Sequence, residues 1–221
     1  MMKNESSKHS KKRALDVFGA ISAIAIFSPI MIGIVALIKI VSPGPVLFKQ
    51  TRVGLNGKRF QCLKFRTMRP NAATTSHTNH FAELIASDQP MTKLDKKGDP
   101  RVIPLGSILR ASGLDELPQL FNIILGDMSL VGPRPGTVAE YELYTTRDRR
   151  RLEALPGLTG LWQVSGKNDT TFSEMIDLDI RYCEEADLGT DLRIIAQTWK
   201  VVAKQLAERF APEPKLTQAK I

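Results

Sequence analysis

Residues 14–38 read ALDVFGAISAIAIFSPIMIGIVALI, a run in which Asp16 carries the only charge. About 20 apolar residues are enough for a helix to cross the hydrocarbon core of a bilayer. The run is longer than the hydrophobic region of an ordinary signal peptide, and no small-x-small cleavage site follows it. A helix that packs in a soluble core normally keeps a polar face, which this run lacks. The sequence therefore predicts a helix that contacts a membrane.

The flanks of this run bear on how the helix sits in the bilayer. Lysine and arginine mark cytoplasmic flanks, and here basic residues lie on both sides of the run, at 8, 11, 12 and 13 and again at 39, 49, 52, 58 and 59. In its middle, Pro29 removes a backbone donor and clashes with the preceding turn, while the hydroxyl of Ser28 can satisfy the freed carbonyl. We therefore expect a kinked, re-entrant helix that enters and leaves on one face. A tilted, kinked span is the alternative.

The net positive charge of the chain comes from its first third. The 221 residues carry 31 Lys+Arg and 23 Asp+Glu, yet residues 1–82 have a balance of +11 and residues 83–221 a balance of −3. Such asymmetry indicates a polyanionic partner. Because the charge flanks an apolar helix, we expect an anionic membrane surface and no nucleic acid. Two cysteines, Cys62 and Cys183, make neither a disulfide framework nor a zinc cluster, which favours a reducing compartment.

Beyond the apolar run, the pattern predicts an α+β fold. Asn56-Gly57 between two apolar-rich runs indicates a small β-hairpin. Amphipathic or interfacial helices are expected at about 81–86, 117–125, 138–146, 172–185 and 191–210. The chain then divides into a basic tail (1–13), the re-entrant membrane helix (14–41), a domain on the cytoplasmic face (42–210) and a polar tail (211–221).

Two features of this domain admit two interpretations. The apolar stripe of the helix at 191–210, which includes Trp199, either packs in the core or lies in the membrane interface. The arginines at 147 and 149–151 form a charge run that is either solvated or in contact with phosphate groups.

Asp115 and Glu116 stand where a helix begins. Pro118 suits a first helical turn, Gly126 suits a C-terminal cap, and apolar residues at 117, 120, 121, 124 and 125 form one helical face. Acids at such a position cap free N–H groups and complement the helix dipole, which is the simplest account of them. They can also hold a divalent cation or act as a nucleophile.

Arg134 lies between Pro133 and Pro135, so its guanidinium is carried on a stiff backbone. Arginine matches phosphate oxygens in bidentate fashion. The chain contains no P-loop, GxGxxG, HExxH or CxxC motif, and its histidines lie in polar segments without a partner for a Ser-His-Asp arrangement. Carboxylates and basic side chains beside a membrane helix favour phosphoryl transfer.

Five stretches in this order make the chain resemble the bacterial sugar transferases, the monotopic polyprenyl-phosphate phosphoglycosyl transferases. The resemblance runs from about residue 12 to 202 and is that of a short form with the catalytic region only. The stretch at 158–169 is closest to members that transfer hexose-1-phosphate in exopolysaccharide synthesis. The five stretches are KRALDVFGA (12–20), PVLFKQTRVGLNGKRFQCLKFRTM (45–68), DPRVIPLGSILR (99–110), LDELPQLFNIILGDMSLVGPRP (114–135) and PGLTGLWQVSGKND (156–169).

The resemblance implies transfer of a sugar-1-phosphate from a UDP-sugar to undecaprenyl phosphate, with release of UMP, at the cytoplasmic face of the bacterial inner membrane. It implies that Asp115 attacks the β-phosphorus to give a phosphosugar-aspartyl intermediate, and that Glu116 and Asp115 bind magnesium (Mg2+). Arg134 is implied to bind a phosphate, and three further residues have weaker implied roles around the substrate: Lys64, Arg110 and Asp127.

Small departures from the family pattern occur at Ala111, Gly113 and Gly136-Thr137; they bear on substrate details rather than on the reaction class. Galactose and glucose are the donors that the resemblance favours, with N-acetylated and deoxy sugars open, and a homodimer is left open. The competing hypothesis is a non-catalytic membrane adaptor that binds anionic lipid and uses its acids only as helix caps.

Overall fold

The computed structural model describes residues 2–70, 85, 87, 89–91 and 99–210. The predicted helix at 81–86 falls almost wholly outside the described residues, and the tail at 211–221 falls outside them entirely. Among these residues, the 3-10 turns are η1 (Leu55–Gly57), η2 (Leu114–Glu116), η3 (Asp148–Glu153) and η4 (Lys167–Asp169). The strands are β1 (Leu47–Val53), β2 (Arg59–Phe65), β3 (Ser129–Val131), β4 (Gly136–Thr137) and β5 (Gly157–Thr159). The helices are α1 (Met2–Val41), α3 (Gly106–Ser112), α4 (Gln119–Leu125), α5 (Val138–Leu143), α6 (Leu161–Val164), α7 (Phe172–Glu185) and α8 (Leu188–Phe210).

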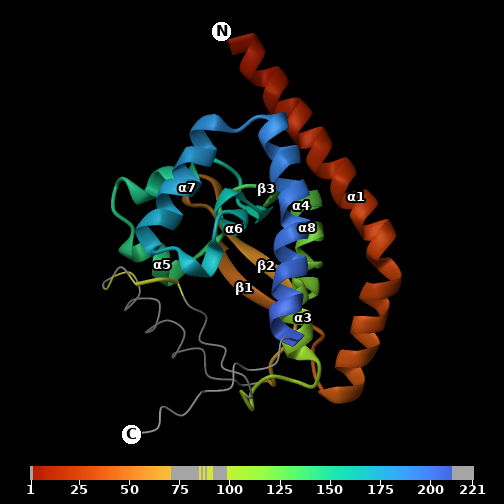
Figure 1. Ribbon diagram of the computed structural model, residues 1–221. Helices are drawn as coiled ribbons and strands as arrows, with labels where there is room; N and C mark the ends of the chain where they lie inside the picture. Colours follow the sequence, from red (N-terminus) through yellow and green to blue (C-terminus); the bar gives the residue numbers. More distant parts are fainter. Residues whose placement is uncertain (1, 71–84, 86, 88, 92–98, 211–221) are drawn as a thin grey trace, which may run out of the picture.

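The described strands form two small sheets at the centre of this mixed α and β structure (Figure 1). The first has the order β2-β1-β4 with both pairs antiparallel, and the second pairs β3 with β5 in parallel. The predicted hairpin is confirmed. Its turn places Asn56 at φ 53° and Gly57 at φ 79°, in the left-handed region that these two residue types tolerate best.

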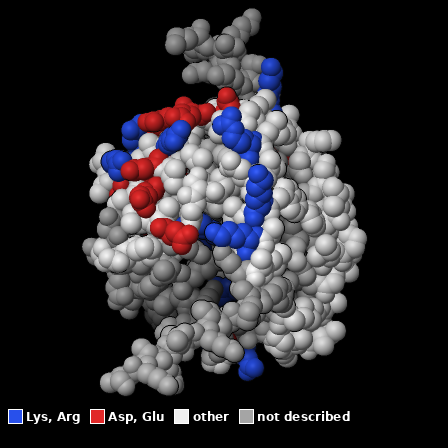
Figure 2. Space-filling view, viewed as in Figure 1, with Lys and Arg blue, Asp and Glu red and all other residues white. Residues whose placement is uncertain are grey.

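Helix α1 runs along one side of the molecule, with α4 and α8 next to it (Figure 1). One face of α1 is buried against the rest of the chain, at Asp16, Ala20, Ile34 and Ile38. Figure 2 shows a broad surface over α1 with almost no charged side chains. The exposed apolar residues of this helix include Phe18, Ile21, Ile26, Ile30, Ile32, Val35 and Ile40. Helix α1 is long and apolar enough to cross a membrane, which agrees with the predicted membrane contact.

Polar contacts fasten the N-terminal part of α1 to the rest of the structure. The buried carboxylate of Asp16 accepts hydrogen bonds from the Ser129 hydroxyl at 2.9 Å and from the Leu130 N–H at 3.0 Å. The ammonium of Lys12 lies 2.6 Å from the carboxylate of Asp191 in α8. The single charge of the apolar run therefore binds the end of β3, since a buried carboxylate needs donors of this kind.

The Ser-Pro step leaves α1 unbroken: one helix extends from Met2 to Val41 with Pro29 inside it. The Ser28 hydroxyl donates to the carbonyl of Ala25 at 3.0 Å. Ala25 is the residue whose carbonyl loses its helical partner because Pro29 has no N–H. The Ser28 hydroxyl therefore bonds as predicted, whereas the kink at Ser28-Pro29 and the re-entrant path through the bilayer stay predictions.

Helix α4 forms where the sequence predicts it, but the predicted apolar face is only partly a core face. Leu120 and Ile123 are buried, while three apolar side chains of the helix stay exposed: Phe121 at 44%, Ile124 at 36% and Leu125 at 72%. Gly126 caps the helix with φ 89°, as predicted. The exposed side chains indicate that α4 borders the same apolar surface as α1.

Helix α8 divides its apolar stripe between core and surface. Ile194 is buried, Leu192 is 56% exposed, and Trp199 is 62% exposed with its ring stacked on Phe27 of α1 at 6.5 Å between centroids. The core interpretation therefore holds for Ile194, whereas the interfacial interpretation of the exposed residues stays a prediction. A tryptophan beside the apolar helix is typical of a membrane interface.

Candidate active site

The acidic pair lies in η2, between α3 and α4. Gly113, at φ 71°, ends α3 in the left-handed region and turns the chain into η2. Asp115 is 8% exposed, whereas the side chain of Glu116 is 37% exposed and lies 2.6 Å from the ammonium of Lys64. Lys64 comes from β2, so the hairpin brings a cation to the acids across 52 positions of sequence. The structure thereby joins three of the predicted site residues.

Two other predicted site residues lie on either side of this group. Arg110 is in the last turn of α3, the helix that precedes η2 and contacts it. Asp127 follows the C-terminal cap of α4, so seven helical residues separate it from the end at which the acids stand. At a rise of about 1.5 Å per residue, that helix is roughly 10 Å long. Asp127 therefore lies at the opposite end of α4 from the acidic pair.

Arg13 occupies that opposite end of α4. Its guanidinium donates to the carbonyls of Ile123 and Ile124 at 2.6 and 2.8 Å. A cation at a helix C-terminus pairs with carbonyls that have no helical partner. This end of α4 is thus an attachment point for α1.

Arg134 follows β3 in the Pro-Arg-Pro loop and faces a buried carboxylate. Its guanidinium donates to Glu140 at 2.5 Å and lies 5.9 Å from the ring centroid of Trp162. Glu140 is 2% exposed. Burial alone would raise the pKa of Glu140, but the Arg134 and Arg52 guanidinia outweigh burial and lower it. The carboxylate is therefore ionised and holds Arg134 in place.

Arg52 is a candidate site residue that the sequence interpretation treated only as one of several basic residues on the hairpin. Burial and the neighbouring charge of Arg134 lower its pKa, and it also interacts electrostatically with Glu140 and Glu116. Its guanidinium donates to the Pro135 carbonyl at 2.9 Å. Arg52 thus contacts the Arg134 loop directly. The sequence contained a signal for this position. The predicted turn fixes a register in which Arg52 lies opposite the apolar Phe60, and two opposite residues of an antiparallel pair share one face of the sheet.

The arginine run does not form one solvated face, which corrects the simpler of its two interpretations. Arg151 is 1% exposed, is paired with the buried Asp179, and donates to the Tyr144 hydroxyl at 2.5 Å and to the Arg134 carbonyl at 2.8 Å. The other arginines of the run are largely exposed and meet Asp177, Glu184 and the ring of Tyr141. A buried arginine needs such partners, and here they fix the backbone of the Arg134 loop.

The acids offer few ligands for a metal ion. Within the part of the chain that the structure describes, no three His, Cys, Asp or Glu side chains form a group that could hold a metal ion. Magnesium in phosphoryl-transfer sites usually takes one or two carboxylates together with substrate phosphates and water. Asp115 and Glu116 are adjacent carboxylates, and this donor set fits such an ion.

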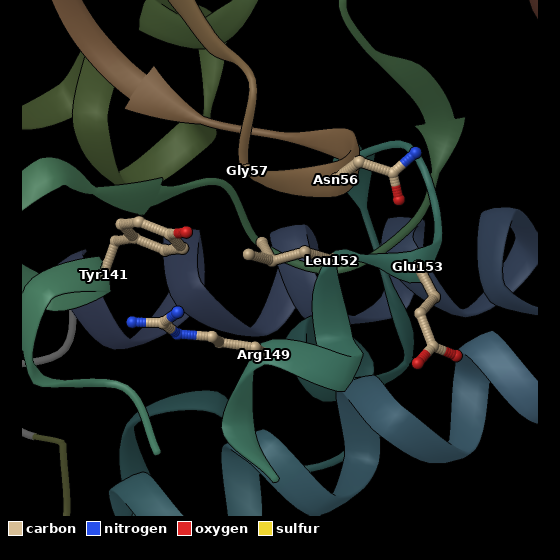
Figure 3. A pocket seen from close by; sticks show the side chains of 6 residues that line it. All are labelled: Asn56, Gly57, Tyr141, Arg149, Leu152 and Glu153. Atoms are coloured by element: carbon tan, nitrogen blue, oxygen red, sulfur yellow. The ribbon is translucent and has the colours of Figure 1, made fainter. Parts of the chain in front are cut away.

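A pocket of about 280 Å³ lies at the other end of the hairpin (Figure 3). The guanidinium of Arg149 lies 5.0 Å from the ring centroid of Tyr141 there. A strand rises about 3.3 Å per residue, so the hairpin turn is roughly 20 Å from Lys64. This pocket is therefore separate from the acidic pair. Its walls are formed by Asn56, Gly57, Tyr141, Arg149, Leu152 and Glu153.

Comparison with known proteins assigns a class to this arrangement of a long apolar helix, acids and basic side chains. Residues 7–205 match the family model described as bacterial sugar transferase. The chain therefore belongs to the bacterial sugar transferase family, as its five sequence stretches predicted.

Three relatives of known name share about two fifths of their aligned residues with this chain. The exopolysaccharide production protein ExoY of Sinorhizobium fredii is 41% identical over 187 residues, which cover 85% of this chain and 83% of that protein. The UDP-glucose:undecaprenyl-phosphate glucose-1-phosphate transferase of Caulobacter vibrioides is 43% identical over 196 residues (85% and 68%). The galactosyl transferase CpsE of Streptococcus agalactiae is 44% identical over 194 residues, covering 86% of this chain but only 42% of that protein.

Proposed function

We propose that this protein transfers a sugar-1-phosphate from a UDP-sugar to undecaprenyl phosphate and releases UMP, as an early membrane step in the assembly of a polysaccharide. Membership of the sugar transferase family supports the reaction class. The names of the Caulobacter transferase and of ExoY support the lipid acceptor and the polysaccharide pathway. The observation that carries the proposal is the acidic pair in η2, with Glu116 held 2.6 Å from Lys64 beside an apolar surface.

The reaction proceeds in two displacements at phosphorus. A carboxylate oxygen of Asp115 attacks the β-phosphorus of the UDP-sugar, and the bond from that phosphorus to the oxygen bridging the two phosphates breaks. UMP leaves with that oxygen, and a phosphosugar-aspartyl intermediate remains. A phosphate oxygen of the lipid then attacks the same phosphorus, and the bond to Asp115 breaks. Covalent catalysis of this kind gives ping-pong kinetics.

Basic side chains around Asp115 stabilise the negative charge that moves during both displacements. Lys64 supplies an ammonium at the acidic pair, and Arg134 binds a phosphate from a loop that Glu140 and Arg151 hold in position. Arg52 adds a second guanidinium near that loop. Asp115 and Glu116 would hold magnesium, which supplies positive charge that neutralises a diphosphate.

The contacts of α1 support a re-entrant path and a cytoplasmic site. Lys12 and Arg13, near one end of the apolar run, bind α8 and α4. At the other end, the buried guanidinium of Arg66 donates to the carbonyls of Ser42 and Pro43 at 2.5 and 3.1 Å. Both ends of the apolar run therefore contact the same folded domain. A straight span across a bilayer about 30 Å thick would instead put the two ends on opposite sides of the membrane. Basic residues on both flanks favour the cytoplasmic side.

The test of the nucleophile compares Asp115→Asn with Asp177→Asn, which makes the same change on an exposed helix position. Both variants should fold, but only Asp115→Asn should lose UMP release from a panel of UDP-sugars with magnesium and undecaprenyl phosphate. Wild-type protein should also retain label from a β-phosphate-labelled UDP-sugar in the absence of lipid. If Asp115→Asn retained the label, Asp115 would not be the nucleophile. If wild-type protein released no UMP with any donor, the proposed reaction would be refuted.

The topology has its own test. Cysteines introduced one at a time at Ser10 and Asn56 lie on the two sides of the apolar run, in protein that lacks Cys183 and keeps the buried Cys62. We expect both to be shielded from a thiol reagent that reaches only the periplasm. Labelling at one of the two positions would indicate a true span.

A further inference from the structure

An apolar groove of about 390 Å³ lies between the C-terminal half of α1, the start of the hairpin and the start of α4. Its volume falls in the range of about 300–1,000 Å³ that is common for small-molecule sites. No residue in its wall is polar, so it cannot serve the sugar or the nucleotide. The groove is lined by Met31, Ile32, Val35, Val46, Leu47, Phe65, Pro118 and Phe121.

The groove opens to the surface and is not a defect of core packing. Ile32 is 69% exposed, Phe121 44% and Leu47 37%. Apolar patches of this kind mark sites for a membrane or a ligand. The exposed side chains of Ile32 and Phe121 lie on α1 and α4, the two helices at the uncharged surface described above, and Leu47 lies at the start of the hairpin. The groove therefore faces the region in which a lipid substrate would lie.

The inner end of the groove adjoins the acidic pair. Pro118, in its wall, is two residues after Glu116 in the chain. Phe65, also in its wall, follows Lys64, and successive strand residues point to opposite faces. Lys64 thus turns toward Glu116 while Phe65 turns into the groove. A cation therefore stands at the point where an apolar channel begins, which is the charge pattern that an anionic lipid with an apolar tail complements.

We propose that this groove holds the part of the isoprenoid chain nearest the phosphate of the lipid substrate, with that phosphate at Lys64. The proposal rests on the proposed function and adds a binding site for the tail of the acceptor. Between the bilayer and the groove the chain gains little from the hydrophobic effect, because lipid tails are also apolar. The groove instead fixes the direction of the chain, and hence the position of its phosphate relative to Asp115.

The experiment fills the groove and leaves the rest of α1 unchanged. Val35→Trp places a large ring in the groove, and Ile26→Trp makes a similar change at a site of the same helix that is 70% exposed and is not in its wall. With purified full-length protein in nanodiscs, we expect Val35→Trp to raise the KM for undecaprenyl phosphate at least tenfold. Ile26→Trp should change that KM by less than twofold. Release of UMP before lipid is added should be the same in both.

That first half-reaction separates the two proposals. If wild type releases no UMP, the proposed function fails. If wild type is active and Val35→Trp has the same KM for the lipid as Ile26→Trp, the groove proposal fails. In that case the groove is filled by ordinary bilayer lipid or by a second copy of the chain. If Val35→Trp loses its UMP burst, its fold is disturbed and the smaller change Val46→Phe, in the opposite wall, decides in the same assay.

Crosslinking gives an independent measurement on unmodified protein. An undecaprenyl phosphate with a diazirine in its first isoprene units should label peptides that contain Val35 or Phe121. Labelling that spreads equally to Ile26 and Ile40, on exposed parts of α1, would overturn the proposal.

Discussion

Replacing Glu140 with glutamine tests whether a buried carboxylate holds the Arg134 loop. Glu140 is 2% exposed, and its Oε2 accepts a hydrogen bond from Arg134 at 2.5 Å. Its charge also acts on Arg52 and Arg151. Glutamine keeps the size of the side chain and removes the negative charge, so that three guanidinia lose one of their counter-charges.

The magnitude follows from burial. Removing one partner of a buried ion pair costs about 3–5 kcal/mol. The side chain of Arg134 is 18% exposed and can therefore reach water. The free energy of unfolding should therefore fall by about 3 kcal/mol, near the lower end of that range. A domain of this size loses about 2–4 °C in Tm for each kcal/mol, so Tm should fall by about 6–12 °C.

Thermal unfolding of the full chain in detergent measures this loss, and Glu184→Gln is the matched control. Glu184 meets Arg150 at 2.6 Å, but both side chains are about half exposed, at 52% and 49%. Exposed pairs contribute about 0–1 kcal/mol, so the control should lose no more than about 4 °C. Equal shifts in the two variants would refute the reasoning that burial makes the Glu140 pair strong. The KM for the UDP-sugar should also rise in Glu140→Gln alone, because Arg134 loses its support.

The pH dependence of the same variant has a defined sign. The pKa of Glu140 lies below its ordinary value of 4.5 because of Arg134 and Arg52, which outweigh burial. Its stabilising effect is therefore complete above pH 4.5 and is lost as the pH falls through the lower pKa of the folded state. The Tm difference between wild type and Glu140→Gln should be constant above that pH and should narrow below it. A gap that widens in acid would contradict this assignment.

Two further substitutions test α1 and the site. Asp16→Ala removes the buried acceptor of two donors in β3. Each unsatisfied donor lowers the free energy of unfolding by about 1–3 kcal/mol, so Tm should fall by at least about 4 °C. An unchanged Tm would mean that the packing of α1 does not depend on this contact. Lys64→Met keeps the length of the chain but removes the ammonium at Glu116, so kcat/KM should fall at least about tenfold. The exposed Lys49→Met on the same hairpin should keep the wild-type value, and equal activity of the two variants would exclude Lys64 from the site.

Much of the fold could be predicted from local patterns. The hairpin turn at Asn56-Gly57 and the cap at Gly126 depend on backbone conformations that few residue types adopt. The long apolar helix α1 follows from the length of an apolar run. The acidic pair stands before α4 because Pro118 marks the start of that helix. Each of these features is set by residues that are close together in sequence.

Other features depended on which distant residues meet. The basic residues of the hairpin look alike in the sequence, but Lys64 binds Glu116, and the partly buried Arg52 contacts the Arg134 loop. Arg151 belongs to a run that looked solvated and is nevertheless buried against Asp179. The apolar face of α4 looked like core, yet Phe121 lines a groove.

The sequence by itself determined the long apolar helix, the hairpin, the position of the acids at the start of a helix and the family. Periodicity, turn chemistry and motif order are properties of neighbouring residues. Only the tertiary structure decided which cations reach the acids, which charges are buried and where the apolar groove opens. These depend on contacts between segments up to 179 positions apart, such as Lys12 with Asp191. Burial and pairing are properties of the packed chain, since they arise only when distant segments exclude water from one another.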